Sequence, residues 1–178
     1  MAFNLVKRSG PHLDSVDPGR LSVEERERLS AELYAVQSEV FSGVDLAQFR
    51  RYVIEAKATY TRVLVARDDN GRVVGYLATH RYNRELDGAP CVILRAETGF
   101  SRAWRGRSLF GRHFVREVLA ALIAARGRPL YFMGSLVHPT SYVAITRYVA
   151  SHWPRPDMQT PQAVRSLLYE LADSFGLQ

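Results

Sequence analysis

The hydrophobic residues change their spacing in the second half of the chain, and this change restricts the fold more than any other feature. A short apolar run at 91–94 has the length of a buried strand. From Phe110 to residue 123 the apolar residues recur every three or four positions, as on one face of a helix, and residues 130–137 form a second strand-like run. A helix between two strands makes a right-handed crossover, so the second strand is expected to lie parallel to its predecessor. The sequence therefore predicts an α/β fold.

A turn rich in glycine and arginine joins the first strand of this unit to its helix. Arg102, Arg105, Arg107 and Arg112 crowd the expected helix start. Cations there oppose the helix dipole by about 0.3–1 kcal/mol each when exposed, whereas the free amides of the first turn attract an anion. The pattern indicates a bound anion, and the alternative is a basic turn that contacts only solvent.

The chain before this unit is predicted to form two helices and then an antiparallel meander. Ser22 and Glu25 have capping-box spacing at the start of the first helix, and Asp45 is a typical N-cap for the second. The Asn70-Gly71 step favours a tight hairpin between two alternating segments. The expected strands of the meander are residues 60–67, 72–80 and 91–97. The chain before the first helix is expected to form a strand at 3–6 and then a loop to residue 20.

After the crossover, a helix is expected at 141–153, and a last helix is expected to begin at Thr160-Pro161. The predicted architecture is a mixed sheet, an antiparallel meander followed by a parallel strand through a crossover helix, flanked by helices. Three regions are predicted: an N-terminal strand and loop at 1–21, a main domain at 22–153, and a Pro-rich loop with a helix at 154–178.

Composition argues against several classes of function. The 178 residues suit one domain, and the net charge of +6, carried almost wholly by arginine, favours anionic partners. We find no stripe of interleaved aromatic and basic residues and no zinc-ligand spacing, so nucleic acid is not an expected partner. The longest apolar run, residues 118–125, is too short to cross a bilayer, and the first residues do not resemble a secretory signal, so a cytoplasmic protein without membrane contact is expected. Cys91 is expected to be a buried apolar side chain, and His80 to be structural or solvent-facing.

The predicted order of two helices, three antiparallel strands, a turn rich in glycine and arginine with its helix, a parallel strand and a helix resembles the GNAT family of acyl-CoA N-acyltransferases over residues 22–153, and two sequence patterns add to this resemblance. In that family the turn after the fourth strand has the form Arg/Gln-x-x-Gly-x-Gly/Ala, and residues 105–110 read Arg-Gly-Arg-Ser-Leu-Phe. The last core helix of the family often shows Asn-x-x-Ala-x-x-x-Tyr, of which this chain keeps Ala144 and Tyr148. Ser108 and Phe110 stand where the family prefers small residues, and the Phe110 ring is expected to hinder close approach to the backbone.

The resemblance implies an acyl-CoA, most simply acetyl-CoA, as co-substrate, and no metal. The turn amides would hold its pyrophosphate, and the strand backbone near Glu97 to Gly99 would pair with its pantetheine arm. The residues expected to bind it are Thr98, Gly99, Arg105, Gly106, Arg107, Ser108, Gly111 and Arg112.

Two side chains are candidates for the chemistry that the resemblance implies. Tyr148 shares a helix face with Ala144 and is expected to protonate the departing thiolate, with Tyr142 as the alternative. Glu97 is the candidate base for an acceptor amine. Arg95 lies on the same face of the strand by period-two alternation, so the alternative for Glu97 is a structural ion pair.

The sequence thus predicts direct transfer of an acyl group, most simply acetyl, from acyl-CoA to an amine on a small molecule or peptide. Two alternatives stay open: transfer from an acyl carrier protein, whose acidic surface would suit the arginines, and a non-catalytic domain that senses an acyl-CoA or serves in assembly. The family usually adds two strands after its last core helix, and none is predicted here. A partner subunit, as in a homodimer, or further sequence is expected to complete the acceptor side of the cleft.

Overall fold

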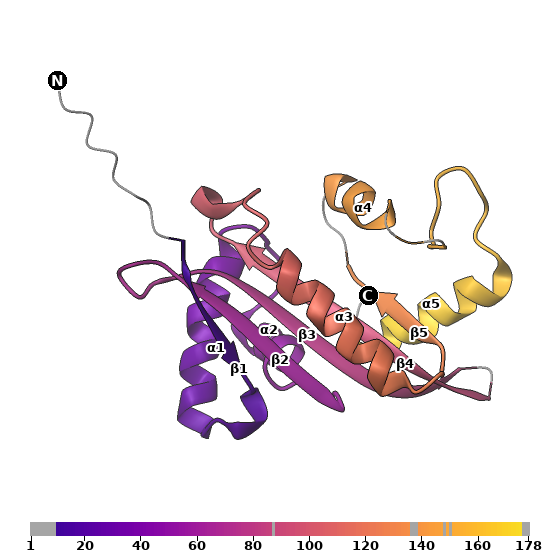
Figure 1. Ribbon diagram of the computed structural model, residues 1–178, viewed down its shortest axis with the longest axis horizontal. Helices are drawn as coiled ribbons and strands as arrows, with labels where there is room; N and C mark the ends of the chain where they lie inside the picture. Colours follow the sequence, from indigo (N-terminus) through magenta and orange to yellow (C-terminus); the bar gives the residue numbers. More distant parts are fainter. Residues whose placement is uncertain (1–9, 87, 136–138, 148, 150, 176–178) are drawn as a thin grey trace. The chain divides into compact units, whose positions relative to one another are not determined.

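A five-stranded mixed sheet runs through the part of the chain before Gly134 (Figure 1). The computed structural model describes residues 10–86, 88–135, 139–147, 149 and 151–175, and the chain divides into two units between Met133 and Gly134. The strand order is β1-β2-β3-β4-β5, antiparallel from β1 to β4 and parallel between β4 and β5, which confirms the predicted α/β architecture. The strands are β1 His12–Val16, β2 Tyr60–Arg67, β3 Val73–Leu86, β4 Ala89–Phe100 and β5 Leu130–Met133.

The first strand of the sheet lies in a segment that the sequence did not predict to be a strand. Residues 12–16, predicted to be loop, form β1 and pair with β2 from His12 opposite Arg67 to Val16 opposite Val63. The segment has no clear alternation of apolar residues, and backbone hydrogen bonds to β2 define it as a strand instead. The strand predicted at 3–6 lies outside the described residues.

Several predicted ends are also wrong. β3 and β4 extend beyond the expected strands and pair with each other from Leu86 opposite Ala89 to Gly75 opposite Phe100. Pairing across the hairpin supplies the extra ladder bonds, which the propensity of each segment by itself does not predict. Strand β5 is shorter than predicted, and the helix expected at 141–153 is α4, Pro139–Thr146.

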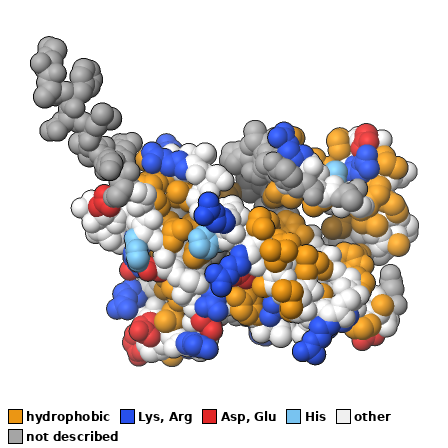
Figure 2. All heavy atoms as spheres, in the orientation of Figure 1, with side chains coloured by type: hydrophobic (Ala, Val, Ile, Leu, Met, Phe, Trp, Pro, Cys, Tyr) orange, Lys and Arg blue, Asp and Glu red, His pale blue; other side chains and the backbone are white. Residues whose placement is uncertain are grey.

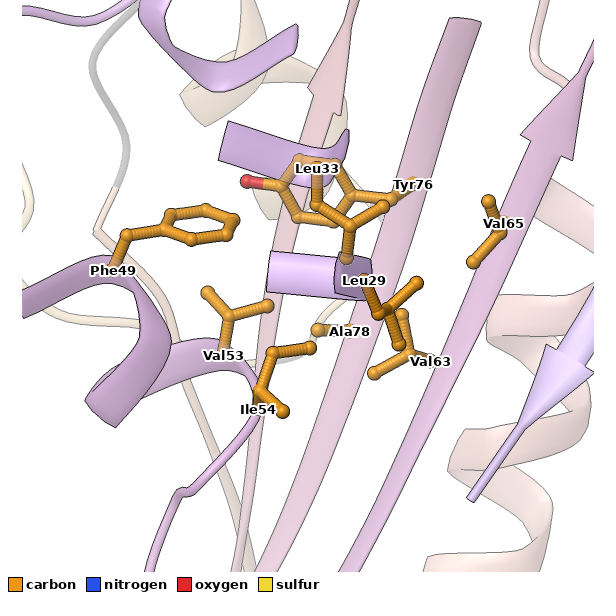
Figure 3. Close-up of a cluster of buried hydrophobic side chains, with 9 residues drawn as sticks. All are labelled: Leu29, Leu33, Phe49, Val53, Ile54, Val63, Val65, Tyr76 and Ala78. Carbon is orange, nitrogen blue, oxygen red and sulfur yellow. The ribbon is translucent and has the colours of Figure 1, made fainter. Parts of the chain in front are cut away.

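Helices α1, Val23–Ser38, and α2, Leu46–Val53, cover one face of the sheet. Both begin with the predicted caps: the Ser22 side chain accepts from the Glu25 amide, and the Asp45 side chain accepts from the Gln48 amide. Each cap satisfies an amide at the helix start and contributes about 1 kcal/mol. Side chains from both helices and from β2 and β3 point toward one another in the resulting core (Figure 3), which contains Leu29, Leu33, Phe49, Val53, Ile54, Val63, Val65, Tyr76 and Ala78.

Helix α3, Gly111–Ala125, packs on the opposite face of the sheet. There Phe110 joins Leu64, Ala66, Val74 and Leu77 in a second core. The sequence predicted a single wide apolar face on this helix, and only part of it meets the sheet. The apolar side chains that stay exposed are Val115, Leu119, Leu122 and Ile123, and Figure 2 shows hydrophobic side chains gathered on the surface around α3.

The second unit contains α4 and α5, Gln162–Ser174, and α5 follows Pro161 as the sequence predicted. Between them Arg155 and Met158 form an isolated antiparallel bridge, and the described residues after β5 include no further strand of the sheet. Among the described helices, none has the length and hydrophobicity needed to cross a bilayer.

Candidate active site

The candidate site begins on β4, where the pairing of that strand changes. β4 pairs with β3 along its whole length, whereas its parallel register with β5 covers only Val92 to Arg95. Within the described residues, no strand pairs with the other edge of β4 from residue 96 to residue 100. Apart from the Phe100 carbonyl, which accepts from Arg105 Nε, backbone amides and carbonyls on that edge are therefore free to pair with an extended ligand.

The turn after β4 takes a conformation that presents backbone amides. Gly106 and Ser108 both have positive φ, +75° and +47°. Ser108 occupies the left-handed region without being glycine, which costs about 1–2 kcal/mol. Helix α3 then begins at Gly111 with Phe110 as its N-cap. No side chain caps the amides of its first turn, and the Gly111 amide donates to the Ser108 carbonyl at 3.4 Å. An uncapped helix start preceded by a strained turn is a suitable anion site.

The Phe110 side chain does not obstruct this turn, so that sequence expectation is wrong. Its ring is buried, stacks on Phe100 with centroids 5.0 Å apart, and packs against Leu64 and Leu77. Burial of the ring in the core under α3 directs the side chain away from solvent, so the ring does not project from the turn. The hydrophobic residue at this position thus anchors the helix start to the sheet.

Arginine side chains surround the turn, and all four are exposed. The Arg107 guanidinium lies 4.6 Å from the centre of the Trp104 ring, and Arg105 Nε donates to the Phe100 carbonyl at 3.4 Å. Arg102 and Arg112 make no hydrogen bond or ion pair with another described residue. The turn therefore combines free amides with positive charge that no carboxylate among the described residues neutralises.

Glu97 lies on β4 just past the end of the β5 pairing, on the face covered by α1 and α2. It forms an ion pair with Arg95, as the shared strand face predicted. Arg95 is only 5% exposed, and its guanidinium lies 5.8 Å from the centre of the Tyr52 ring on α2. Burial raises the pKa of the Glu97 carboxyl above its ordinary value, and the Arg95 charge opposes this shift. The Glu97 side chain keeps 23% of its surface exposed, so a ligand can still reach it.

Thr98 and Gly99 follow Glu97 on the unpaired edge. The Thr98 hydroxyl donates to the Tyr76 carbonyl at 2.8 Å, which ties β4 to β3 at this point. A Cβ on Gly99 would lie 2.6 Å from Cε1 of the Tyr76 ring, so glycine is needed there for the ring to cross the strand. The Tyr76 hydroxyl donates to Gln37 Oε1 at 2.6 Å, which holds the ring in place.

His80 belongs to this region, although the sequence prediction assigned it no part in the site. It lies directly opposite Arg95 in the β3–β4 register and is fully buried. Its Nδ1 lies 3.1 Å from the Thr61 hydroxyl, and its Nε2 has no hydrogen-bond partner among the described residues. Burial, with a smaller contribution from Arg95, lowers the pKa of His80 to about 3. The sequence indicated this position of His80, because strand alternation puts Tyr76, Ala78 and His80 on the same face of β3, the face that α1 and α2 cover.

The tyrosines proposed as acids belong to the second unit. Tyr148 lies outside the described residues. Tyr142 is on α4, and its hydroxyl donates to the Pro154 carbonyl at 2.7 Å. The structure therefore brings together every predicted cofactor residue on β4 and the turn, together with Glu97, and leaves the assignment of the acid a prediction.

Several solved structures with a similar fold are acetyltransferases. An aminoglycoside N-acetyltransferase, AAC(6')-Iy in complex with CoA, is 14% identical with a TM-score of 0.51, over 86% of this chain and 97% of that chain. A ribosomal-protein-alanine N-acetyltransferase from Brucella melitensis biovar Abortus 2308 is 12% identical with a TM-score of 0.51, over 84% and 100%. An aminoglycoside acetyltransferase from an uncultured soil metagenomic sample, in complex with trehalose, is 10% identical with a TM-score of 0.51, over 84% and 95%. No family model and no curated protein matches the sequence.

Proposed function

Because the chain has the GNAT fold of these acetyltransferases, we propose that it transfers an acyl group from acyl-CoA to an amine. The fold itself confirms the sequence resemblance. The observation that carries the proposed activity is the turn before α3, where Ser108 adopts positive φ and no side chain caps the helix amides. A protein that used α3 only for packing would gain about 1 kcal/mol from an N-cap side chain there.

Acyl-CoA fits the two free backbone surfaces described above. The amides between Ser108 and Arg112 would bind the pyrophosphate, with Arg105 and Arg107 supplying positive charge. The unpaired edge of β4 at Thr98 and Gly99 would pair with the amides of the pantetheine arm, as an added strand does. This arrangement would place the thioester close to Glu97.

Glu97 would act on the acceptor. Its carboxylate takes a proton from the substrate ammonium, directly or through water, and the neutral nitrogen attacks the thioester carbonyl. The C–N bond forms as the C–S bond breaks, and the nitrogen releases its second proton to solvent. The thiolate of CoA takes a proton from Tyr148, whose tyrosinate then regains one from solvent. Burial brings the pKa of Glu97 closer to neutral pH, which suits a base better than an ordinary glutamate. Arg95 would keep the carboxylate oriented and partly ionised.

Binding of CoA tests the proposal directly. We expect Arg107→Glu to weaken CoA binding by about tenfold or more in isothermal titration calorimetry, since a charge-assisted contact contributes about 1.5–3 kcal/mol. Arg51→Glu is the matched control, because Arg51 is an exposed arginine on α2, across the sheet from α3. Equal losses in both variants would mean that a diffuse positive field attracts CoA. If CoA does not bind at millimolar concentration but a holo acyl carrier protein does, the acyl donor is the carrier protein and not acyl-CoA.

Turnover tests the chemistry separately from binding. Thiol release from acetyl-CoA, measured with a panel of small-molecule and peptide amines, is expected to fall by about 100-fold in Tyr148→Phe, with the Kd for CoA unchanged. Glu97→Gln is expected to remove the acid limb of the pH–rate profile, because the parent loses activity as Glu97 becomes protonated. A parent protein that binds CoA and acylates no amine would instead be an acyl-CoA sensor.

A further inference from the structure

A second cleft lies between α3 and the sheet, and the orientation of α3 creates it. The exposed apolar residues of this helix, Val115, Leu119, Leu122 and Ile123, leave the inward positions over β2 to polar side chains. His113, Arg116, Glu117 and Ala120 follow a spacing of three or four residues and line the cleft, facing β2 and β3. A helix that only filled a core would turn its apolar residues inward here.

The cleft has the size of a small-molecule site. Its volume is about 430 Å³, within the range of pockets that hold small ligands. Leu64 and Leu77 form an apolar floor on the sheet, and Thr79 lies beside them. Ala120 is a small residue on the helix side, so the cleft stays open between longer polar side chains.

Positive charge dominates the walls. Arg116 is exposed, and its side chain makes no hydrogen bond or ion pair with another described residue. Arg62 donates from Nε to the Tyr60 hydroxyl at 3.2 Å and has no carboxylate within ion-pair distance among the described residues. The Tyr60 ring is itself held by the Arg81 guanidinium, 4.6 Å from its centre. Glu117 is the one acidic side chain among the residues that line the cleft, against the two arginines there, and Arg62 also interacts electrostatically with Asp17 nearby.

We propose that this cleft binds a small monocarboxylate with an apolar body. The carboxylate lies between Arg62 and Arg116, and the body packs on Leu64 and Leu77. A phosphate dianion fits this lining less well, because Glu117 repels its second negative charge. Phosphate also has no apolar group to bury against Leu64 and Leu77. An amine is disfavoured by both arginines.

The site is separate from the proposed acyl-CoA site. Phe114, on the neighbouring edge of α3, contacts Phe132 of β5 with ring centroids 5.6 Å apart. His113 lines the cleft over β2, on the side of the helix away from the unpaired edge of β4. Occupancy of the cleft therefore does not require acyl-CoA, and the inference stands whether or not the proposed function holds.

The test uses 3-phenylpropionate as the probe, with 3-phenylpropylamine and inorganic phosphate as comparisons. Titrations of the full chain followed by amide chemical shifts are expected to give a Kd on the order of 1–10 mM for the carboxylate, as suits about eleven non-hydrogen atoms. The largest shifts are expected at Leu64, Leu77 and Ala120. Equal affinity for the amine, displacement by phosphate, or shifts centred on the turn before α3 would overturn the proposal.

Two variants distinguish this site from the acyl-CoA site. Arg116→Gln is expected to weaken 3-phenylpropionate binding by about tenfold and to leave the Kd for CoA unchanged. Arg112→Gln, on the same helix, is expected to weaken CoA binding only. Both side chains are exposed, so both variants should fold, and melting curves check this. Unchanged binding of the probe in Arg116→Gln and in Arg62→Gln would refute the assignment.

Discussion

Gly99 is predicted to be the least replaceable small residue in the candidate site. In Gly99→Ala the new Cβ would lie 2.6 Å from Tyr76 Cε1 and 3.2 Å from its Cζ. Carbon atoms in contact prefer about 3.5–4.0 Å, so the ring would have to move by roughly 1 Å. The ring is 1% exposed, donates its hydroxyl to Gln37 and packs edge-on against Phe49 with centroids 5.8 Å apart. It has little room to move.

The expected loss of stability follows from these contacts. Overpacking of a filled core costs about 1–3 kcal/mol, and the lower entropy of alanine in the unfolded chain returns about 0.4–1 kcal/mol. A net loss of about 0.5–2 kcal/mol should lower the melting temperature by about 1–8 °C in a chain of this length. Calorimetry or circular dichroism melts measure it.

Gly10→Ala is the control for this substitution. Gly10 has no atom within 4 Å of an added Cβ, so its replacement should be neutral or slightly stabilising. A double-mutant cycle with Tyr76→Leu should make Gly99→Ala less costly, because the ring that it meets is gone. Equal melting temperatures of Gly99→Ala and Gly10→Ala would refute this prediction. So would a double-mutant cycle without coupling between Gly99→Ala and Tyr76→Leu.

Three further predictions concern the residues around this site. Burial lowers the pKa of His80 to about 3, so between pH 6.5 and 3 the imidazole takes up a proton in the unfolded chain but not in the folded protein. As the pH falls through this range, His80 should therefore lower the unfolding free energy by up to about 1.4 kcal/mol per pH unit. Urea melts at pH 6 and 5 should show a smaller loss of stability in His80→Gln than in the parent. Ser108→Gly should stabilise the protein by up to about 1 kcal/mol, because it relieves the left-handed backbone, and should leave the Kd for CoA unchanged; a melt below that of the parent would contradict the strain argument. Phe110→Ala should cost about 3–5 kcal/mol in urea unfolding, and a cost under 1 kcal/mol would mean that its ring is not part of the core.

Short-range sequence patterns predict much of the architecture. The caps at Ser22 and Asp45 act within one helical turn, so short spacings predict them. The change of hydrophobic period after β4 predicts the crossover and the parallel strand, because chirality leaves one way to connect them. The turn at 105–108 was likewise visible as a strand-to-helix step rich in glycine and arginine, whereas the positive φ of Gly106 and Ser108 was not predicted.

The direction of each side chain was decided by tertiary packing. Helical spacing groups Phe110 with other apolar residues of α3 but does not say which of them meets the sheet, and the structure buries Phe110 while Ile123 stays 79% exposed. Alternation places Arg95 and Glu97 on one face, yet only the packing of α1 and α2 over that face buries the pair and raises the pKa of Glu97. Strand β1 was missed because its pairing partner, not its own pattern, makes it a strand. Periodicity records which residues share a surface, whereas burial and charge environment depend on elements far away in the chain.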